Sequence, residues 1–164
     1  EAHAMAIADT DPLTGLLNRR AFLRALLERQ SHWTLVLLDV DHFKRVNDSL
    51  GHAGGDEALA LISETLQEVA PSGALVARLG GEEFAIAYRG NLLLLEPEDL
   101  LASVRQINLP QGYRITASIG IANRIVASEH DWKILYRAAD MALYRAKTGG
   151  RDRFILIRQQ NVAA

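Results

Sequence analysis

Two pairs of carboxylates in this 164-residue sequence stand where they could do chemistry. Glu82 and Glu83 follow directly after the glycine pair 80–81, and Asp39 and Asp41 follow an aliphatic run. Carboxylates brought together from strand ends form an oxygen site suited to Mg²⁺, which completes its shell with substrate phosphates. Two such ions about 3.5–4 Å apart serve in-line phosphoryl or nucleotidyl transfer. Taken alone, the stretch around Glu82 is equally compatible with a solvated acidic turn.

Three cations are candidates for holding the phosphates. Lys44 comes shortly after Asp41, and Lys147 and Arg151 are spaced i, i+4 across the end of a predicted helix. Asp39 would be costly to bury unpaired at the end of an apolar strand, which favours a ligand role for it.

The composition limits the class of protein. A chain of 164 residues with 49% hydrophobic and 23% charged residues is typical of one globular domain. The net charge of −2 argues against a surface that coats nucleic acid, and the absence of cysteine excludes disulfides and is compatible with a reducing cytosol. The aliphatic runs are too short to span a bilayer. Because the chain opens on Glu1, we expect a domain of a longer, cytoplasmic protein, with an upstream sensor or a membrane anchor outside this sequence.

The expected elements place these groups at the ends of strands. Residues 74–77 and 84–88 predict a hairpin turning at Gly80-Gly81, with positive φ at both glycines. Strand parity would then send Glu82 and Glu83 to opposite faces. The run 34–38 predicts a central strand covered on both faces, ending at Asp39.

The helices follow from apolar periodicity and end signals. We expect a helix after the N-cap Asn18, a short helix over 43–50, a loop over 51–56 and a longer helix to about residue 69. Further helices should start at Pro97 and at Asp131, the latter ending at 148–150, with strands over 115–122 and 154–157. The leucine run 91–96 fits a strand or a helix equally well.

Six ordered motifs closely resemble the GGDEF family, the diguanylate cyclases, over nearly the whole chain. They are DPLTGLLNRR at 11–20, DVDHFKRVND at 39–48, GHAGGD at 51–56, GGEEF at 80–84, SIGIA at 118–122 and ADMALYRAK at 139–147. The resemblance implies an α+β fold, with a mainly antiparallel five-stranded, palm-like sheet flanked by helices, as in nucleotidyl cyclases. It assigns residues 11–164 to the catalytic domain and 1–10 to the end of an upstream linker or signalling helix.

The resemblance also implies a reaction and roles for residues. Two GTP-loaded subunits of a homodimer would join two GTP into cyclic di-GMP, releasing pyrophosphate, with two Mg²⁺ ions per site (Mn²⁺ being an alternative). Asp39, the carbonyl of Val40, and Glu82 would hold the metals, and Glu82 would help to activate the attacking 3′-hydroxyl. The substrate-binding set by resemblance is Asn47, Asp56 and His52 at the guanine nucleotide, Phe43 (backbone), Lys44, Lys147 and Arg151 at the phosphates, and Gly80 and Gly81 for close backbone approach. Lys44 is also counted as catalytic.

Plainer readings stand beside these roles. Asp41 is left out of the metal set because it could cap a helix, and His42 reads as a surface or packing residue. Asn47 and Asp56 could be capping residues. Arg19 and Arg20 read as structural or interfacial.

The sequence departs from the family at three places. One is the region 89–111, which matches the family weakly and looks shortened. An inhibitory Arg-x-x-Asp product site is absent, because residues 71–74 read Pro-Ser-Gly-Ala. The usual Gly-Arg-Asn reads Gly150-Arg151-Asp152, which brings an anionic group near the phosphate cations. Two alternative functions are a catalytically silent GTP-binding regulatory module and another nucleotidyl transferase on a palm-like fold. The absence of a basic nucleic-acid track counts against the second.

Overall fold

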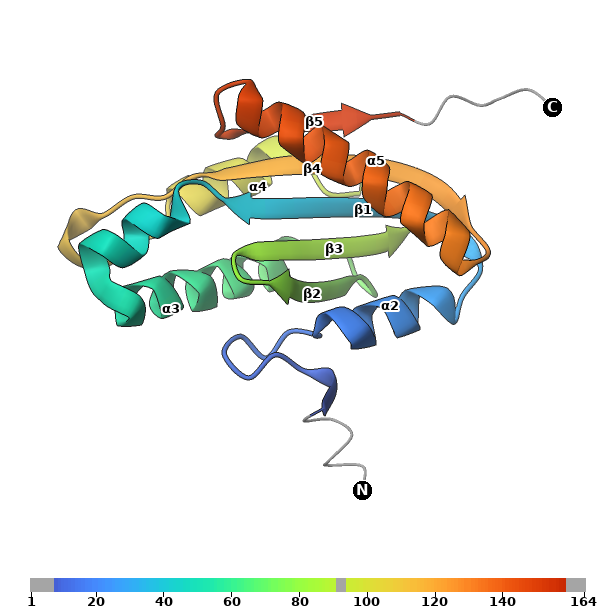
Figure 1. Ribbon diagram of the computed structural model, residues 1–164, viewed down its shortest axis with the longest axis horizontal. Helices are drawn as coiled ribbons and strands as arrows, with labels where there is room; N and C mark the ends of the chain where they lie inside the picture. The colour runs from blue at the N-terminus through green and yellow to red at the C-terminus, as the bar shows by residue number, and fades with distance from the viewer. Residues whose placement is uncertain (1–7, 91–93, 159–164) are drawn as a thin grey trace.

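A five-stranded sheet forms the centre of the protein in a computed structural model that describes residues 8–90 and 94–158. The strand order is β2-β3-β1-β4-β5 (Figure 1). The strands are β1 (Ser31–Val40), β2 (Leu75–Gly80), β3 (Glu83–Arg89), β4 (Ala117–Val126) and β5 (Arg153–Ile157). The helices are α2 (Arg19–Leu27), α3 (Phe43–Val69), α4 (Pro97–Arg105) and α5 (Glu129–Thr148), with a 3-10 turn η1 (Pro110–Gly112).

The sheet is mixed rather than purely antiparallel. β1 pairs antiparallel with β3 and β4, and β2 pairs antiparallel with β3, whereas β5 runs parallel to β4. The parallel pair arises because α5 carries the chain back across the sheet between β4 and β5. The expected mainly antiparallel five-stranded α+β sheet is confirmed, with this one parallel edge.

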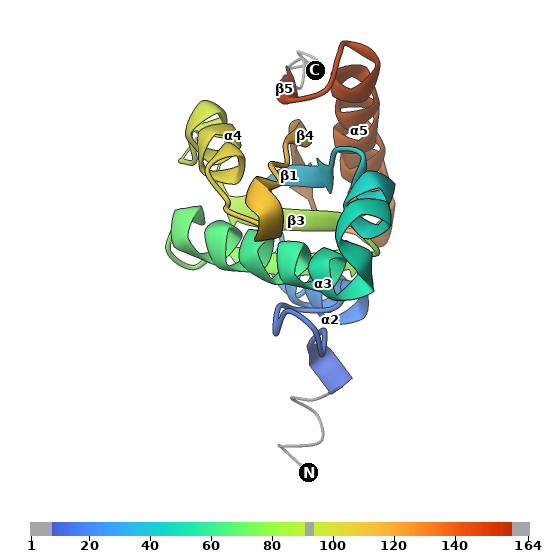
Figure 2. The same ribbon diagram turned by 90° about the vertical axis from the view of Figure 1, so that its left-hand side faces the viewer.

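Helices cover both faces of the sheet, so β1 is buried on both sides as predicted. Because side chains alternate along a strand, one face of β1 packs against α3 and α4 and the other against α2 and α5. Val36 and Leu38 belong to the first core, and Leu35 and Leu37 to the second. Figure 2 shows α4 and α5 on opposite sides of the sheet.

Local sequence signals explain where most helices begin. The side chain of Asn18 accepts a hydrogen bond from the N–H of Ala21 at 2.9 Å, and α4 begins at Pro97 with acids in its first turn, both as predicted. α5 begins two residues earlier than predicted, at Glu129, because Ser128 is its N-cap. β4 begins two residues later than predicted, at Ala117. No helix of the described ranges is long and apolar enough to cross a membrane.

The predicted loop over 51–56 was wrong. α3 continues through it, and only Gly51 leaves helical geometry, with φ of 74° and ψ of 176°. The glycine pair 54–55 allows the two halves to pack closely, since a Cβ on Gly55 would lie 1.9 Å from Oδ1 of Asn47. The glycines that suggested a loop therefore serve a kink and a close contact. Residues 91–93 of the ambiguous leucine run lie outside the described residues.

The predicted hairpin is present, but its turn is shifted by one residue. The turn residues are Gly81 and Glu82, β2 ends at Gly80, and a register irregularity follows Arg78. Of the two glycines only Gly81 has positive φ, at 25°. Glu82 therefore lies in the turn rather than in the strand, and the expected strand parity between Glu82 and Glu83 does not apply.

α5 lies directly on β4 at Gly120, and this contact sets the position of the helix that carries Lys147. A Cβ at Gly120 would lie 2.2 Å from the carbonyl oxygen of Ala139 and 2.3 Å from the nitrogen of Leu143. Both are backbone atoms of α5, so a side chain here requires the whole helix to move. α5 buries a stripe of small and apolar residues, formed by Leu135, Ala139, Ala142 and Ala146.

We expect Gly120→Ala to lower the free energy of unfolding by about 1–3 kcal/mol, because an added methyl group overpacks the interface between β4 and α5. Urea denaturation followed by circular dichroism measures the change. Gly80→Ala is the matched control, since no atom lies within 4 Å of a Cβ built there. An equal loss of unfolding free energy in the two variants, or no loss in Gly120→Ala, would contradict close packing of α5 on β4 at Gly120.

Candidate active site

A cleft of about 230 Å³ opens at the end of the sheet where β1 finishes. The end of β1, the start of α3, the turn between β2 and β3 and the C-terminal end of α5 all gather there, at the left of Figure 1. The residues that line it come from three stretches distant in sequence. They are Asp39, Val40, Asp41, His42, Phe43, Lys44, Glu82, Lys147 and Arg151. The three residues of the predicted metal set and the three predicted phosphate cations are therefore brought together.

Asp39 is the carboxylate that β1 contributes to this cleft, and it is partly buried. One carboxylate oxygen, Oδ2, pairs with the ammonium group of Lys147, whereas Oδ1 is buried with no hydrogen-bond partner among the described residues. Burial is the main cause that raises the pKa of Asp39, Lys147 opposes the rise, and Asp41 adds to it. A buried carboxylate oxygen without a partner has an unmet demand for a donor or a cation.

Glu82 approaches Asp39 from the hairpin turn. The main chain of the turn is tied to β1, because the N–H of Val40 donates to the carbonyl of Glu82 at 3.3 Å. Burial raises the pKa of Glu82, and the nearby charge of Asp39 raises it further, while Lys147 opposes the rise. Two carboxylates thus share one site, and the charge of Lys147 acts on both of them. Among the described residues no cluster of three or more acidic or imidazole side chains could hold a metal.

The first turn of α3 supplies a second kind of binding group. His42 precedes the helix with a left-handed backbone, φ 52° and ψ 41°, and its side chain makes no capping hydrogen bond. The first N–H groups of a helix lack intrahelical partners and favour anions. Phe43 and Lys44 carry these groups into the cleft wall. His42 also lines the cleft, a role that the sequence analysis did not assign to it.

Asp41 fixes the loop between β1 and α3. Its carboxylate accepts hydrogen bonds from Thr116 Oγ1 at 2.7 Å, Ser118 Oγ at 2.6 Å and the backbone N–H of Asp152 at 2.9 Å. The suggestion that Asp41 caps a helix was wrong, because its oxygens face β4 and the turn before β5. Only the three-dimensional pairing of β1 with β4 could have revealed this role.

Glu83 turns toward α5 and away from the cleft lining. It lies opposite Asp39 in the register of β1 and β3, and Tyr136 donates a hydrogen bond to its Oε1 at 2.9 Å. Burial is the main cause that raises the pKa of Glu83, and burial together with Glu83 raises the pKa of Tyr136 to about 12. The guanidinium of Arg19 lies 5.5 Å from the centre of the Tyr136 ring. Arg19 therefore has a structural contact.

The sequence model of the family described as "Diguanylate cyclase, GGDEF domain" matches residues 8–153. This chain belongs to the GGDEF domain family. It is 38% identical over 158 residues to the diguanylate cyclase DgcM of Escherichia coli K12, an alignment that covers 90% of this chain and 38% of that protein. It is 36% identical to the diguanylate cyclase DgcP of Pseudomonas aeruginosa, with 88% and 23% covered. The chain thus spans less than half the length of these relatives.

Solved structures of the family have the same fold. The coiled coil and GGDEF domain of DgcB from Caulobacter crescentus, in complex with c-di-GMP, matches with a TM-score of 0.84 and 30% identity, covering 95% of this chain and 89% of that one. The diguanylate cyclase SiaD of Pseudomonas aeruginosa, in complex with its activator SiaC, matches with a TM-score of 0.81 and 31% identity, covering 96% and 65%.

The remaining residues assigned by the GGDEF resemblance lie outside the lining of this cleft. Asn47, His52 and Asp56 lie on α3 on either side of its kink, with Asn47 half-buried and the other two exposed. Gly80 and Gly81 are exposed at the hairpin turn, with open space where a Cβ would project. The structure thus brings together the metal and phosphate sets and leaves the predicted base-binding residues outside the cleft lining.

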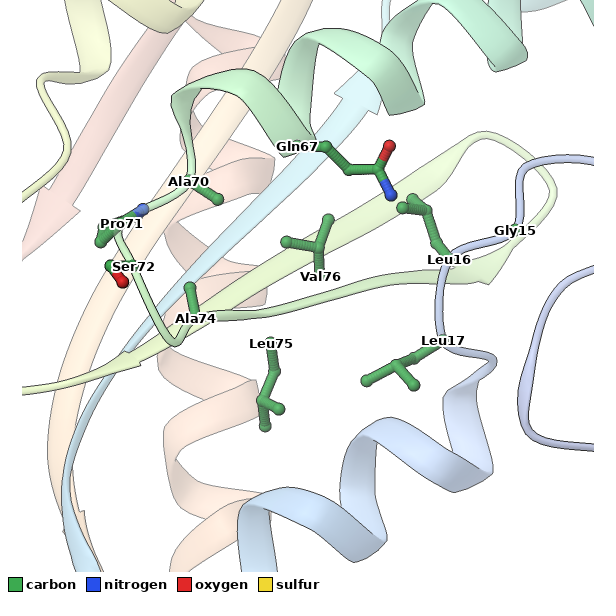
Figure 3. A pocket seen from close by; sticks show the side chains of 10 residues that line it. All are labelled: Gly15, Leu16, Leu17, Gln67, Ala70, Pro71, Ser72, Ala74, Leu75 and Val76. Atoms are coloured by element: carbon green, nitrogen blue, oxygen red, sulfur yellow. The ribbon is translucent and has the colours of Figure 1, made fainter. Parts of the chain in front are cut away.

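The position of the absent Arg-x-x-Asp motif lines a separate pocket of about 440 Å³. Figure 3 shows Pro71, Ser72 and Ala74 along it, with Gln67 from α3 and leucines from the segment before α2. None of the ten lining side chains is charged. An anionic ligand would find no cation there.

The entry motif, DPLTGLLNRR at 11–20, holds the hairpin turn at Gly81 and Glu82 in place. Asp11 Oδ2 accepts from the N–H and the hydroxyl of Thr14 at 2.9 and 2.8 Å, and Arg78 pairs with Asp11 at 3.2 Å. The Nε of Arg78 donates to the carbonyl of Gly81 at 2.9 Å. Burial alone would raise the pKa of Asp11, but the Thr14 hydrogen bonds and the charge of Arg78 lower it below 3.8. Arg78 therefore links the turn to the N-terminal segment.

We expect Asp11→Asn to unfold at lower urea than the unchanged protein at pH 7. Folding lowers the pKa of Asp11. The ionised carboxylate therefore stabilises the folded protein above pH 3.8, and this stabilisation is lost as the pH falls through the lowered pKa of the folded state. The difference in urea midpoint between Asp11→Asn and the unchanged protein should therefore become smaller as the pH is lowered from 7 to 3. Asp48→Asn, an exposed carboxylate on α3, is the control. A difference that is constant across this range would contradict the ionic contact between Asp11 and Arg78.

Proposed function

We propose that this domain is a diguanylate cyclase that condenses two GTP into cyclic di-GMP and two pyrophosphates across a dimer of GTP-loaded subunits. The observation that carries the proposal is the convergence of Asp39 and Glu82 with Lys44, Lys147 and Arg151 around one cleft. Carboxylates for a divalent ion and cations for phosphates are what nucleotidyl transfer requires. Membership of the GGDEF family supports the choice of substrate and product.

The donor set fits a divalent metal. Oδ1 of Asp39, which has no partner among the described residues, and the half-buried carboxylate of Glu82 are hard oxygen ligands. Val40 also lines the cleft, and its carbonyl would be a third oxygen ligand. Asp39, Val40 and Glu82 would hold two Mg²⁺ ions, or Mn²⁺ in their place. When bound, the ions would neutralise charge on the triphosphate and stabilise the attacking and leaving oxygens.

The residues of this chain bind and orient the rest of the substrate. The first turn of α3, at Phe43 and Lys44, would take the terminal phosphates through backbone N–H groups and one ammonium. Lys147 would exchange its pairing with Asp39 for the phosphates once a cation occupies the carboxylates. Arg151 would add a second positive charge from the turn after α5.

The base and the reacting hydroxyl come next. Asn47 and Asp56 would hydrogen-bond guanine, His52 would lie beside the nucleotide, and the exposed glycine pair 80–81 would let it approach the backbone. Glu82 would accept the proton of the 3′-hydroxyl as that oxygen attacks the α-phosphorus of the partner's GTP. The bond from the α-phosphorus to the pyrophosphate oxygen breaks, and pyrophosphate leaves.

We expect the purified domain to convert GTP to cyclic di-GMP with Mg²⁺, and Asp39→Asn and Glu82→Gln to lower the rate by at least ~100-fold, more than is typical for losing a metal's outer partners. Mass spectrometry of the products measures this. Glu68→Gln, an exposed glutamate on α3, controls for the loss of one charge.

One outcome of this experiment would favour the alternative function, a catalytically silent GTP-binding module. Tight binding of GTP without turnover, even at high protein concentration, would indicate such a module.

Turnover requires two loaded subunits to meet, because each subunit holds half of the reactants. At low enzyme concentration the initial rate should therefore rise faster than linearly as the enzyme concentration is raised.

We expect cyclic di-GMP to cause no non-competitive inhibition, because the pocket lined by Pro71, Ser72 and Ala74 has no charged side chain. Initial rates at several GTP concentrations, with and without added product, separate the two kinds of inhibition. Product that competes at the active site raises the apparent KM only. A fall in kcat at saturating GTP would show that a product site exists despite the missing motif.

A further inference from the structure

The turn that delivers Arg151 to the cleft has an unusual backbone. Gly150, Arg151 and Asp152 have φ of 121°, 64° and 49° in succession. The left-handed region is unfavourable for a non-glycine residue, because its Cβ comes too close to the following carbonyl oxygen. Two such residues in a row persist only if neighbouring contacts hold them in place.

Three contacts hold this turn. The N–H of Arg151 donates to the carbonyl of Ala146 at 2.9 Å, which ties the turn to the end of α5. The N–H of Asp152 donates to Asp41 at 2.9 Å, which ties it to the loop after β1. The carboxylate of Asp152 accepts from Nε of Arg105 at 2.8 Å, and this third contact comes from α4.

The contact with Arg105 has an electrostatic consequence for the cleft. Asp152 follows Arg151, whose side chain lines the cleft. An unpaired carboxylate at residue 152 would therefore weaken the attraction of the cleft for phosphates. Arg105 neutralises that carboxylate and holds it at α4. Neither Arg105 nor Asp152 lines the cleft. The anionic group that the sequence placed near the phosphate cations is thus paired elsewhere.

We propose that Arg105 is a positioning residue for the triphosphate site. It acts through Asp152, by holding at α4, away from the cleft, the carboxylate that this residue carries in place of the usual asparagine. Arg105 is then needed only while position 152 is an aspartate. The inference rests on the proposed binding of GTP.

The test compares Arg105→Ala in two backgrounds, the unchanged chain and Asp152→Asn. Isothermal titration with a non-hydrolysable GTP analogue and Mg²⁺ measures affinity without requiring turnover. In the unchanged background the loss should be about two- to fivefold, the range of an exposed ion pair. Both partners are 39% exposed, so the loss should also shrink as salt is raised. In the Asp152→Asn background there is no carboxylate to hold, so Arg105→Ala should cost clearly less affinity, namely only the effect of removing one exposed positive charge.

The control is Arg114→Ala. The guanidinium of Arg114 donates to the carbonyls of Arg105 and Ile107 at 3.5 Å, and neither of these hydrogen bonds involves Asp152. Its effect on affinity should be equal in the two backgrounds. Thermal melting of every variant reports whether α4 remains folded.

The outcomes separate the two proposals. Equal losses from Arg105→Ala in both backgrounds, or no loss in either, with normal binding by the unchanged chain, would overturn the role of Arg105 alone. An unchanged chain that binds no GTP analogue would overturn the proposed function and this inference with it. A loss from Arg105→Ala that is clearly larger in the unchanged chain than in the Asp152→Asn background would support both.

Discussion

The site depends on the antiparallel register between β1 and β3. Asp39 is paired with Glu83 in that register, so the next residue outward, Glu82 in the turn, is placed beside Asp39 at the end of the sheet. Two apolar cores fix β1 from both faces, which prevents the strand from sliding. A shift of one residue would send Asp39 to the opposite face, toward α3 and α4. The acidic site is therefore a consequence of how the core is packed.

Several hydrogen bonds convert this register into a defined cleft. Asp41 joins the loop after β1 to β4 and to the turn before β5, and Arg78 joins the hairpin turn to the entry motif. The missing side chain at Gly120 lets α5 lie directly on β4, which fixes the helix that carries Lys147 in its last turn. The motifs of the sequence thus divide into groups that face the cleft and groups that hold them there.

The sequence predicted well what depends on local pattern. The apolar run 34–38 has no polar alternation and became the central strand, and Asn18 and Pro97 marked the starts of α2 and α4. The sequence also predicted that Asp39 and Glu82 would meet the three cations, and Lys44, Lys147 and Arg151 do line the same cleft. Their roles as metal and phosphate ligands stay predictions. Where glycine was involved the pattern misled: a Gly-rich run at 51–56 became a kinked helix, and the hairpin turned at Gly81-Glu82. Glycine permits both turns and close packing, and only the neighbouring elements decide between them.

Long-range partners were beyond the sequence. Nothing near Asp41 indicates that Thr116 and Ser118 donate to it, and nothing near Asp152 indicates Arg105, 47 positions earlier. Such contacts depend on which strands and helices become neighbours.

The most direct test is a crystal structure of the domain with Mg²⁺ and a non-hydrolysable GTP analogue. The account predicts electron density for a divalent ion bound by the carboxylates of Asp39 and Glu82, with the terminal phosphates at the first turn of α3. An ion and a triphosphate bound away from these two carboxylates would contradict it.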